Sequence, residues 1–473
     1  MSVKILFGPP GTGKSTKLID ILEEEMANGV EPDKLAFASF TRKAVQEVLG
    51  RVRDQFRLSS TDFPYFKTLH SLAYSMMGIL HTEVMQTEHY KDLGELLGLE
   101  FSGKGDYEEG ASTAKFIGDV FVYIEGYARA RKISYEDAWR KLEADNSYNW
   151  LAFNQFYRTL HAYKKDRGLF DFADFLESNV DPLDIDVAII DEAQDLSTVQ
   201  WEFALRVFSR AKRIYIAGDD DQAIYNWSGA DVRAFLSIPG EKITLDQSFR
   251  VPNAVHAVAE EIAGRIGHRF NKAYKPSGKQ GFVEYYRYLD DIDFSSGSWM
   301  LLARNAYHLA HLSRLMRTHG YLYSYRGSST VNKDHINAIT VFEAWRKGSP
   351  ITVEEALTVA KYMPKEHQSQ WPNVIWHEAL IGIPLEDRAF YISLLRRGER
   401  INRTPRIHIN TIHAVKGGEA DNVLLLTDMT TKTHGGMQTS PDNEHRVWYV
   451  GATRCKEGLH IVLPHTKLFY DLC

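Results

Sequence analysis

The chain has 473 residues, of which 44% are hydrophobic and 25% charged, and it carries a formal net charge of −6. This composition excludes collagen-like, fibrous and intrinsically disordered proteins, and no apolar run reaches the roughly 20 residues needed to span a bilayer. The N-terminus lacks a secretory signal, and two cysteines, Cys455 and Cys473, are too few for a disulfide framework or a zinc cluster. We therefore expect a cytoplasmic protein of about three domains without membrane association. The net charge leaves nucleic-acid binding open, because an acidic protein can still carry a local basic groove.

The first half of the chain predicts a parallel sheet covered by helices on both faces, because apolar strands alternate there with helical patterns. In chain order, the expected strands are 3–7, 35–40, 187–191 and 214–219, with helices expected at 15–28 and 41–53. Ligands of such sheets bind beyond the carboxyl ends of the strands. Several of these runs end at carboxylates or at a glycine-rich turn, which indicates a ligand site at that edge.

The pattern between about 80 and 168 is helical and predicts an inserted subdomain. Its basic clusters fit a solvated face and a DNA-facing surface equally well. A second alternating pattern later in the chain predicts a second sheet, interrupted by a helical insertion at 331–399. Within this pattern Tyr321, Tyr323 and Tyr325 alternate, which favours one face of a packed strand over a set of nucleic-acid contacts.

The segment GPPGTGKS at 8–15 has the spacing of a phosphate-binding loop, and it follows a predicted strand and opens a predicted helix. Backbone N–H groups of Gly11 to Lys14 can converge on a phosphate at the N-terminus of that helix. Lys14 is then expected to bridge the β- and γ-phosphates of ATP, and Ser15 to hold Mg²⁺. A chance glycine-rich turn is the weaker alternative.

Two further segments complete a predicted nucleotide site. VAIIDEAQD at 187–195 puts Asp191 and Glu192 after a strand, where one carboxylate can hold Mg²⁺ and the other can accept a proton from the attacking water. In AGDDDQAIYNWSGAD at 217–231, Gln222 lies at a strand end and can sense the γ-phosphate. Together with the phosphate loop, these segments predict hydrolysis of a nucleoside triphosphate.

The order and wording of these motifs resemble superfamily 1A DNA helicases of the UvrD/PcrA/Rep type. The resemblance continues through SFTRKAVQEV (39–48), KTLHSLAY (67–74), LFDFADFL (169–176), LDQSFRVP (245–252), NTIHAVKGGEADNV (410–423) and HRVWYVGATRCKEGLHIV (445–462). It therefore runs from the phosphate loop almost to the C-terminus, and the string GDDDQAIYNWSGAD is highly specific by itself.

The resemblance implies an α/β fold of two RecA-like P-loop domains, each a parallel sheet flanked by helices, with a helical insertion 1B and a reduced insertion 2B. Domain 1A is expected at 1–80 and 169–245, insertion 1B at 81–168, domain 2A at 246–330 and 400–473, and insertion 2B at 331–399. ATP is expected between domains 1A and 2A.

Residue roles follow from the same resemblance. The implied catalytic residues are Lys14, Asp191, Glu192, Gln222, Arg250 and Arg454, of which the two arginines meet the γ-phosphate. The implied ATP-binding residues are Gly8, Pro9, Pro10, Gly11, Thr12, Gly13, Lys14, Ser15, Thr16, Phe249 (stacked on the base) and Glu419 (on the ribose). Mg²⁺ is expected on Ser15 and Asp191. The implied DNA-binding residues are Phe40, Thr41, Thr68, His70, Tyr225, Trp227, Asn305, Thr411 and His413.

Three departures from the family pattern are visible. Ser228 occupies a position where the family has an arginine, and the insertion at 331–399 is far shorter than the usual 2B subdomain. The upstream glutamine motif that reads adenine is not found before Gly8. We also expect neither a nuclease domain nor a partner-recruiting tail after the last motif.

The function implied is an ATP-dependent translocase on single-stranded DNA that unwinds tailed duplexes with 3′→5′ polarity, in a bacterial cell or a phage-infected host. One alternative is a non-unwinding, DNA- or nucleotide-sensing ATPase subunit of a larger complex, for example in phage defence. A small-molecule P-loop kinase is a weaker alternative, because it leaves Trp227, Arg454 and the second sheet unexplained. The sequence identifies no protein partner.

Overall fold

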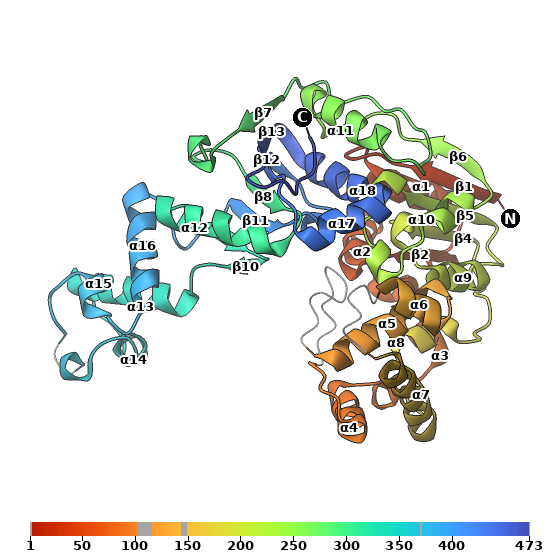
Figure 1. The fold of residues 1–473 in the computed structure, drawn as a ribbon, viewed down its shortest axis with the longest axis horizontal. Coiled ribbons are helices and arrows are strands. Elements are labelled where there is room, and N and C mark those ends of the chain that lie inside the picture. Colours follow the sequence, from red (N-terminus) through yellow and green to blue (C-terminus); the bar gives the residue numbers. More distant parts are fainter. Residues whose placement is uncertain (1, 103–115, 143–148, 369–370, 473) are drawn as a thin grey trace. The chain divides into compact units, whose positions relative to one another are not determined.

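The structure, a computed structural model, describes residues 2–102, 116–142, 149–368 and 371–472 (Figure 1). Contacts divide the chain into two compact units. The first unit comprises Met1–Val251, Ala263–Gly278 and Pro441–Tyr449, and the second comprises Pro252–Ile262, Lys279–Ser440 and Val450–Cys473. Cys473 and parts of the predicted insertions 81–168 and 331–399 lie outside the described residues.

The first unit contains a six-stranded parallel sheet. Its strands are β1 (Ser2–Phe7), β2 (Leu35–Ser39), β3 (Tyr65–Thr68), β4 (Val187–Asp191), β5 (Arg213–Gly218) and β6 (Glu241–Thr244). Their order across the sheet is β3-β2-β4-β5-β1-β6, and every neighbouring pair is parallel. The carboxyl ends of β4, β5 and β1 therefore lie next to one another at one edge, with β5 in the middle.

Helices cover both faces of this sheet, because successive strand residues point to opposite sides. Leu6 and Phe37 pack on the side of α1 (Lys14–Ala27) and α2 (Arg42–Phe56). Ile5 packs on the other side, where the helices are α3 (Leu69–Met77), α8 (Phe172–Glu177), α9 (Thr198–Val207) and α10 (Val232–Ser237). All residues of the central strands β2 and β4 are buried, which explains their continuous apolar runs.

A helical group in the same unit has a core of its own. It consists of α4 (Thr87–Leu97), α5 (Ile117–Arg131), α6 (Tyr135–Leu142) and α7 (Trp150–Arg167). Phe121, Phe153 and Phe156 form the centre of its core, with ring centroids 5.5 to 6.4 Å apart. The helical character predicted for this stretch is confirmed for its described residues.

A buried ionic network joins α5 to α8. The Arg129 guanidinium is 7% exposed and lies 3.0 Å from an Asp171 carboxylate oxygen, 2.6 Å from Asp174 and 2.7 Å from Glu177. Lys164 of α7 pairs with the same Asp171. The basic residues of this segment therefore serve partly as buried counterions, an alternative to the solvated and DNA-facing interpretations.

The second unit contains a seven-stranded sheet. Its strands are β7 (Phe282–Tyr286), β8 (Trp299–Ala303), β9 (Tyr323–Tyr325), β10 (Ser328–Ser329), β11 (Ile407–Thr411), β12 (Ala420–Leu426) and β13 (Cys455–Val462). The order is β10-β9-β11-β8-β12-β13-β7, and only the β10–β9 pair is antiparallel. Tyr323 and Tyr325 lie in β9 and Tyr321 precedes it. Tyr321 and Tyr323 are 5% and 1% exposed, which supports packing for these two tyrosines, whereas Tyr325 is only partly buried.

Further helices precede or lie between the strands of the second sheet along the chain. They are α11 (Asn253–Gly264), α12 (Leu309–His319), α13 (Lys333–Arg346), α14 (Val353–Ala360), α15 (Trp376–Ala379), α16 (Leu385–Arg397), α17 (Thr431–Thr439) and α18 (Pro441–Ala452), with α11 and α18 each contributing residues to both units. Residues of α12, α13 and α16 share one hydrophobic core with β8 and β11. The predicted class, α/β with parallel sheets flanked by helices, is thus confirmed. No helix within the described ranges combines the length and apolar character needed to cross a bilayer.

Candidate functional site

The glycine-rich loop lies between β1 and α1, at the edge where the central strands of the first sheet end. Gly11 and Gly13 have φ values of +71° and +76°, which glycine adopts without strain. A Cβ added to Gly8 would lie 1.9 Å from Lys14 Cγ, so the Lys14 side chain passes directly over Gly8. The loop therefore has the backbone and the lysine placement that phosphate binding requires.

The Lys14 ammonium points toward the carboxylates at the end of β4. Its Nζ lies 3.7 Å from Glu192 Oε1. Burial alone would lower the pKa of Lys14, but the charges of Glu192 and Asp219 raise it above its usual value. Burial together with the Glu192 charge raises the pKa of Asp191 to about 7. Glu192 itself has φ +51°, an unusual conformation for a non-glycine residue that is typical of functional sites.

Gln194 connects the end of β4 to the end of β5. Its Nε2 donates to Glu192 Oε2 at 2.5 Å, and its Oε1 accepts from the Asp219 backbone N–H at 3.0 Å. Gln194 is fully buried. Gln194 is not among the site residues predicted from the sequence, although the string DEAQD contains it two positions after Glu192.

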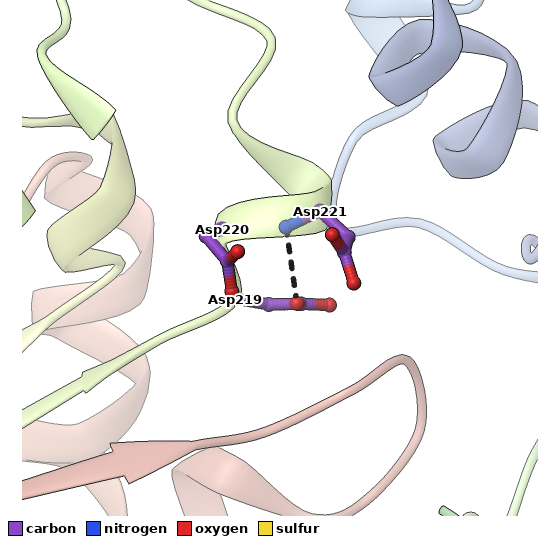
Figure 2. A group of neighbouring side chains, drawn as sticks. All are labelled: Asp219, Asp220 and Asp221. Atoms are coloured by element: carbon purple, nitrogen blue, oxygen red, sulfur yellow. Dashed lines mark hydrogen bonds between the residues drawn. The ribbon is translucent and has the colours of Figure 1, made fainter. Parts of the chain in front are cut away.

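Three consecutive carboxylates follow β5 and are fully buried (Figure 2). Oxygen atoms of Asp219, Asp220 and Asp221 all lie within 4.8 Å of one another, close enough for a cation site. An ammonium already occupies that role, because Lys272 Nζ lies 3.0, 2.7 and 2.6 Å from oxygens of the three residues in turn. Arg269 adds a bidentate pair to Asp221 at 2.9 and 2.5 Å. We therefore describe the carboxylates as an ionic cluster and assign no metal to them.

Gln222 lies in the short 3-10 turn that carries this cluster. Its Nε2 donates to Asp219 Oδ2 at 2.7 Å, and the side chain is 6% exposed. Gln222, Glu192 and Lys14 thus belong to one hydrogen-bonded and ionic chain at the edge of the sheet.

The segment after β6 packs directly on the phosphate loop, and contacts group it with the first unit. The Phe249 backbone N–H donates to the Gly11 carbonyl at 2.8 Å, and Ser248 Oγ donates to the Pro10 carbonyl at 2.8 Å. A Cβ on Gly11 would lie 2.4 Å from Arg250 Cβ, so no larger residue fits there. The Phe249 side chain is 74% exposed and approaches Gly13. An exposed ring beside the loop is available for stacking on a base.

Two of the predicted nucleotide residues lie in the second unit. Glu419 is exposed and pairs with Lys456 at 2.5 Å. Arg454 is 1% exposed, and its guanidinium donates to the Val450 carbonyl at 2.9 Å and to Thr453 Oγ1 at 3.2 Å. The Arg454 side chain is therefore held inside its own unit by these contacts.

The three aromatic residues predicted to bind DNA form a cluster in the first unit. The Phe40 and Tyr225 rings are stacked with centroids 5.2 Å apart, and Trp227 meets Tyr225 edge-on at 6.1 Å. All three are partly exposed. The Trp227 carbonyl accepts from the Tyr123 hydroxyl at 2.7 Å, which ties this cluster to the helical group.

The polar residues predicted to bind DNA are less uniform. Thr41 and Thr68 are N-caps of α2 and α3, accepting from the Ala44 and Ser71 backbone N–H groups. His70 is partly buried, and burial lowers its pKa to about 4.

In the second unit the three predicted polar residues are buried. Asn305, Thr411 and His413 are 5%, 1% and 4% exposed. The Asn305 side chain accepts from the Thr430 backbone N–H and donates to Thr433 Oγ1. The Asn305 amide thus binds residues at the start of α17, which is an alternative to a direct contact with a DNA strand.

The residues at this edge suit a hydrated divalent cation beside a phosphate. Ser15 is exposed at the start of α1, and Asp191 is a buried carboxyl at the end of β4. Hydroxyl and carboxylate oxygens are the ligands that Mg²⁺ prefers. The donor set thus fits Mg²⁺, with Ser15 and Asp191 as the residues that would hold it.

Comparisons with known proteins match most of this chain. The sequence pattern of the UvrD/REP helicase N-terminal domain matches residues 2–242, and that of the UvrD-like helicase C-terminal domain matches residues 385–466. A solved structure described as "Complex structure of Arterivirus nonstructural protein 10 (helicase) with DNA" aligns with 98% of this chain and 62% of that chain, with 11% identity and a TM-score of 0.35.

Three curated relatives show similar levels of identity. A "Probable DNA helicase" of Mycoplasma pneumoniae is 24% identical over 57% of this chain and 55% of its own length. An "ATP-dependent DNA helicase Rep" of Buchnera aphidicola is 22% identical over 57% and 42%, and an "ATP-dependent DNA helicase PcrA" of Bacillus subtilis is 23% identical over 63% and 42%. The chain spans about half the length of the curated relatives that it matches.

Proposed function

Because the chain belongs to the UvrD/REP helicase family, we propose that it is an ATP- and Mg²⁺-dependent DNA helicase that translocates 3′→5′ along single-stranded DNA. The observation that carries the ATPase part is the convergence of Lys14, Asp191, Glu192 and Gln222 at the ends of three neighbouring strands. This group combines a phosphate-binding loop, a cation ligand, a proton acceptor and a γ-phosphate sensor.

The proposed chemistry divides these roles among the chain's own residues. Lys14 and the loop N–H groups bind the phosphates, and Glu192 accepts the proton of the attacking water. Mg²⁺, when bound, neutralises charge on the phosphate oxygens. Arg250 and Arg454 are proposed to stabilise the charge that develops on the γ-phosphoryl group. Phe249 stacks on the base, and Glu419 is proposed to bind the ribose.

For the domains we propose the boundaries expected from the sequence, with domain 1A at 1–80 and 169–245 and domain 2A at 246–330 and 400–473. Insertions 1B and 2B then correspond to 81–168 and 331–399. The two separate sheets support this division, and the helical group with its own core supports the first insertion. Contacts group Ala263–Gly278 and Pro441–Tyr449 of the proposed domain 2A with the first unit.

The DNA part of the proposal rests on the aromatic cluster of Phe40, Tyr225 and Trp227. Aromatic side chains bind single strands without sequence preference, because every base has a face that can stack, and each contact contributes about 1–3 kcal/mol. The 3′→5′ polarity and the preference for tailed duplexes rest on the family resemblance. The polar contacts proposed are Thr41, Thr68, His70, Asn305, Thr411 and His413.

ATP hydrolysis with and without single-stranded DNA is the first test, followed by unwinding of duplexes with a 3′ or a 5′ tail. We expect DNA to stimulate hydrolysis and only the 3′-tailed duplex to be unwound. Lys14→Ala should abolish both activities, whereas Lys17→Ala, one turn further along α1, should retain them. Stimulated hydrolysis without unwinding of either duplex would instead support the DNA-sensing ATPase subunit, and an absence of stimulation by DNA would contradict both.

Trp227→Ala should separate unwinding from hydrolysis. It removes one stacking platform and no proposed phosphate contact, so unwinding should fall at least about tenfold while basal hydrolysis stays within about threefold. Trp227→Phe keeps an aromatic face and should retain most unwinding. If Trp227→Ala lowers basal hydrolysis as much as unwinding, the indole is a packing residue of the helical group and the stacking role is wrong.

A further inference from the structure

Lys272 lies outside every motif recognised in the sequence, yet it is the most buried lysine near the nucleotide site. Its side chain is 1% exposed, and its ammonium contacts Asp219, Asp220 and Asp221, whose side chains are 0% exposed. The segment that carries it, Ala263–Gly278, belongs by its contacts to the first unit. Burial of a charged lysine destabilises the folded protein unless the ammonium is paired with opposite charges. The position of Lys272 therefore indicates a role for its charge at this site.

We propose that Lys272 is a positioning residue for ATP hydrolysis, which acts through Asp219 to orient the Gln222 amide toward the γ-phosphate. This inference rests on the function proposed above and adds a residue to it. The inference is based on one carboxylate, that of Asp219, whose two oxygens contact two different side chains. Asp219 Oδ1 faces Lys272 Nζ at 3.0 Å, and Asp219 Oδ2 accepts from Gln222 Nε2 at 2.7 Å.

The charge of Asp219 determines which end of the Gln222 amide faces it. An ionised carboxylate only accepts hydrogen bonds, so it binds one N–H of the amide NH₂ group, and the second N–H of that group can donate to a γ-phosphate oxygen. A protonated carboxyl could also donate a hydrogen bond, so it could pair with either the NH₂ group or the oxygen of the Gln222 amide. Burial favours the protonated form, but the charges of Lys272 and Lys14 hold the pKa of Asp219 below its usual value. Lys272 thus keeps Asp219 ionised, and the ionised Asp219 determines the orientation of the Gln222 amide.

Asp219 is also connected to Glu192, the proposed proton acceptor, through Gln194. Its backbone N–H donates to Gln194 Oε1, and Gln194 Nε2 donates to Glu192 Oε2. Because β5 lies between β4 and β1, a displacement of Asp219 is transmitted to Glu192 as well as to Gln222. Lys272 therefore supports Gln222 through the Asp219 carboxylate, and it supports Glu192 through the Asp219 backbone N–H and Gln194.

The opposing interpretation is that Lys272 only neutralises three buried carboxylates. Both interpretations predict that Lys272→Met lowers the melting temperature, so stability does not distinguish them. Arg269 provides a matched control, because it neutralises the same cluster through Asp221 and makes no ion pair with Asp219. A purely stabilising role predicts the same effect on catalysis for Lys272→Met and Arg269→Met.

The test measures ADP affinity and turnover separately, since ADP lacks the phosphate that Gln222 senses. We expect Lys272→Met to lower kcat at least about tenfold and to leave the Kd for ADP within about threefold, and Arg269→Met to leave both within about threefold. Equal losses of kcat in the two variants, or an equal loss of ADP affinity and kcat in Lys272→Met, would overturn the proposal.

A double-mutant cycle with Gln222→Ala tests the pathway itself. If Lys272 acts through Gln222, the double variant should be slower than Gln222→Ala by less than about threefold, whereas independent effects would multiply. Should Lys272→Met fail to fold, Asp219→Asn interrupts the same pathway with an isosteric group, and wild-type turnover by Asp219→Asn would overturn the proposal. If the wild-type chain hydrolyses no ATP, the proposed function fails. The inference is then tested by the binding of ADP with orthovanadate, which Lys272→Met should weaken relative to ADP alone.

Discussion

At the scale of single residues, the nucleotide site depends on close approaches that only small side chains permit. Gly218 is one of these residues, because a Cβ there would lie 2.6 Å from Gln194 Oε1 and 3.0 Å from the Phe235 ring. Gln194 needs this space to reach the Asp219 backbone. The glycine at the end of β5 therefore protects the connection between the residues that follow β4 and those that follow β5.

Gly218→Ala should displace Gln194 and lower both stability and turnover. Overpacking of a buried site typically costs about 1–3 kcal/mol, and we expect the free energy of unfolding in urea to fall by that amount. Gly50→Ala in α2 is the matched control, since nothing lies within 4 Å of its added Cβ. This control should raise stability by about 0.5–1 kcal/mol through helix propensity. A Gly218→Ala variant as stable and active as wild type would show that Gln194 has room to move.

His70 should make the free energy of unfolding depend on pH. Its native pKa is lowered to about 4 by burial, whereas an unfolded histidine titrates near its ordinary value of about 6.5. Between these values the unfolded state binds the proton and the native state does not, so stability falls as pH drops from 6.5 to 4. Urea unfolding at pH 7 and pH 5 should show a smaller loss for His70→Gln than for wild type. An identical loss would mean that His70 titrates normally in the native state.

At the scale of secondary-structure elements, the helical group is fixed to the first unit by charge as well as by apolar packing. Arg129 of α5 meets Asp171 at the N-cap of α8 and Asp174 within it, and Lys164 of α7 meets the same two carboxylates. A buried cation removed from such a network leaves its partners uncompensated.

Arg129→Met should therefore lower the free energy of unfolding by about 3–5 kcal/mol. Arg140→Met offers a control on α6, because the Arg140 side chain is 68% exposed and its ion pairs contribute at most about 1 kcal/mol. Denaturant titration of both variants compares a buried with a solvated arginine of the same helical group. A loss below about 1 kcal/mol for Arg129→Met would indicate that the carboxylates are protonated or rehydrated in its absence.

The elements that the sequence predicted are those with a strong local pattern. The central strands are continuous apolar runs because both their faces are buried, and α1 and α2 follow glycine-rich or capping residues. The missed strands β3 and β6 lie at the two edges of the first sheet, where YFKT and EKIT carry polar residues. An edge strand needs little apolar surface, so its sequence resembles a loop.

The residues of the candidate site were likewise predictable where they belong to a local sequence motif. Lys14, Asp191 and Glu192 belong to motifs whose spacing reflects local backbone geometry. Lys272 reaches its partners only through tertiary structure, and no local pattern distinguishes it from a surface lysine. The burial of Thr411 and His413 likewise depends on packing within the second unit rather than on their neighbours in sequence.

At the scale of the whole molecule, the first unit is assembled from three separate stretches of chain. Met1–Val251 contains all six strands of its sheet, but Lys272 and Arg269 come from Ala263–Gly278, and Pro441–Tyr449 adds the start of α18. A fragment that ends at 251 therefore keeps Asp219, Asp220 and Asp221 and loses their counterions.

Fragment 1–280 should consequently be markedly more stable than fragment 1–251. Three buried carboxylates without Lys272 and Arg269 must become protonated or hydrated, which opposes folding. Thermal melts at pH 7.5 should show a cooperative transition for 1–280 and a weak or absent one for 1–251. Adding Lys272→Met and Arg269→Met together to fragment 1–280 should reproduce the behaviour of 1–251. Equal melting of the two fragments would show that the ionic cluster contributes little.

The strand order of the first sheet also has a consequence for biosynthesis. β1 and the loop after it are translated well before the neighbours of β1, which are β5 and β6 and end at Gly218 and Thr244. At ribosomal rates of about 5–20 residues per second, β1 waits on the order of ten seconds or longer before either neighbour emerges. Pairing over such separations is slow, so we expect the VKILF segment of β1 to be exposed to chaperones and to aggregation throughout that interval. The proposed nucleotide site thus cannot form until β5 and β6 have been translated, although its glycine-rich loop is translated well before them.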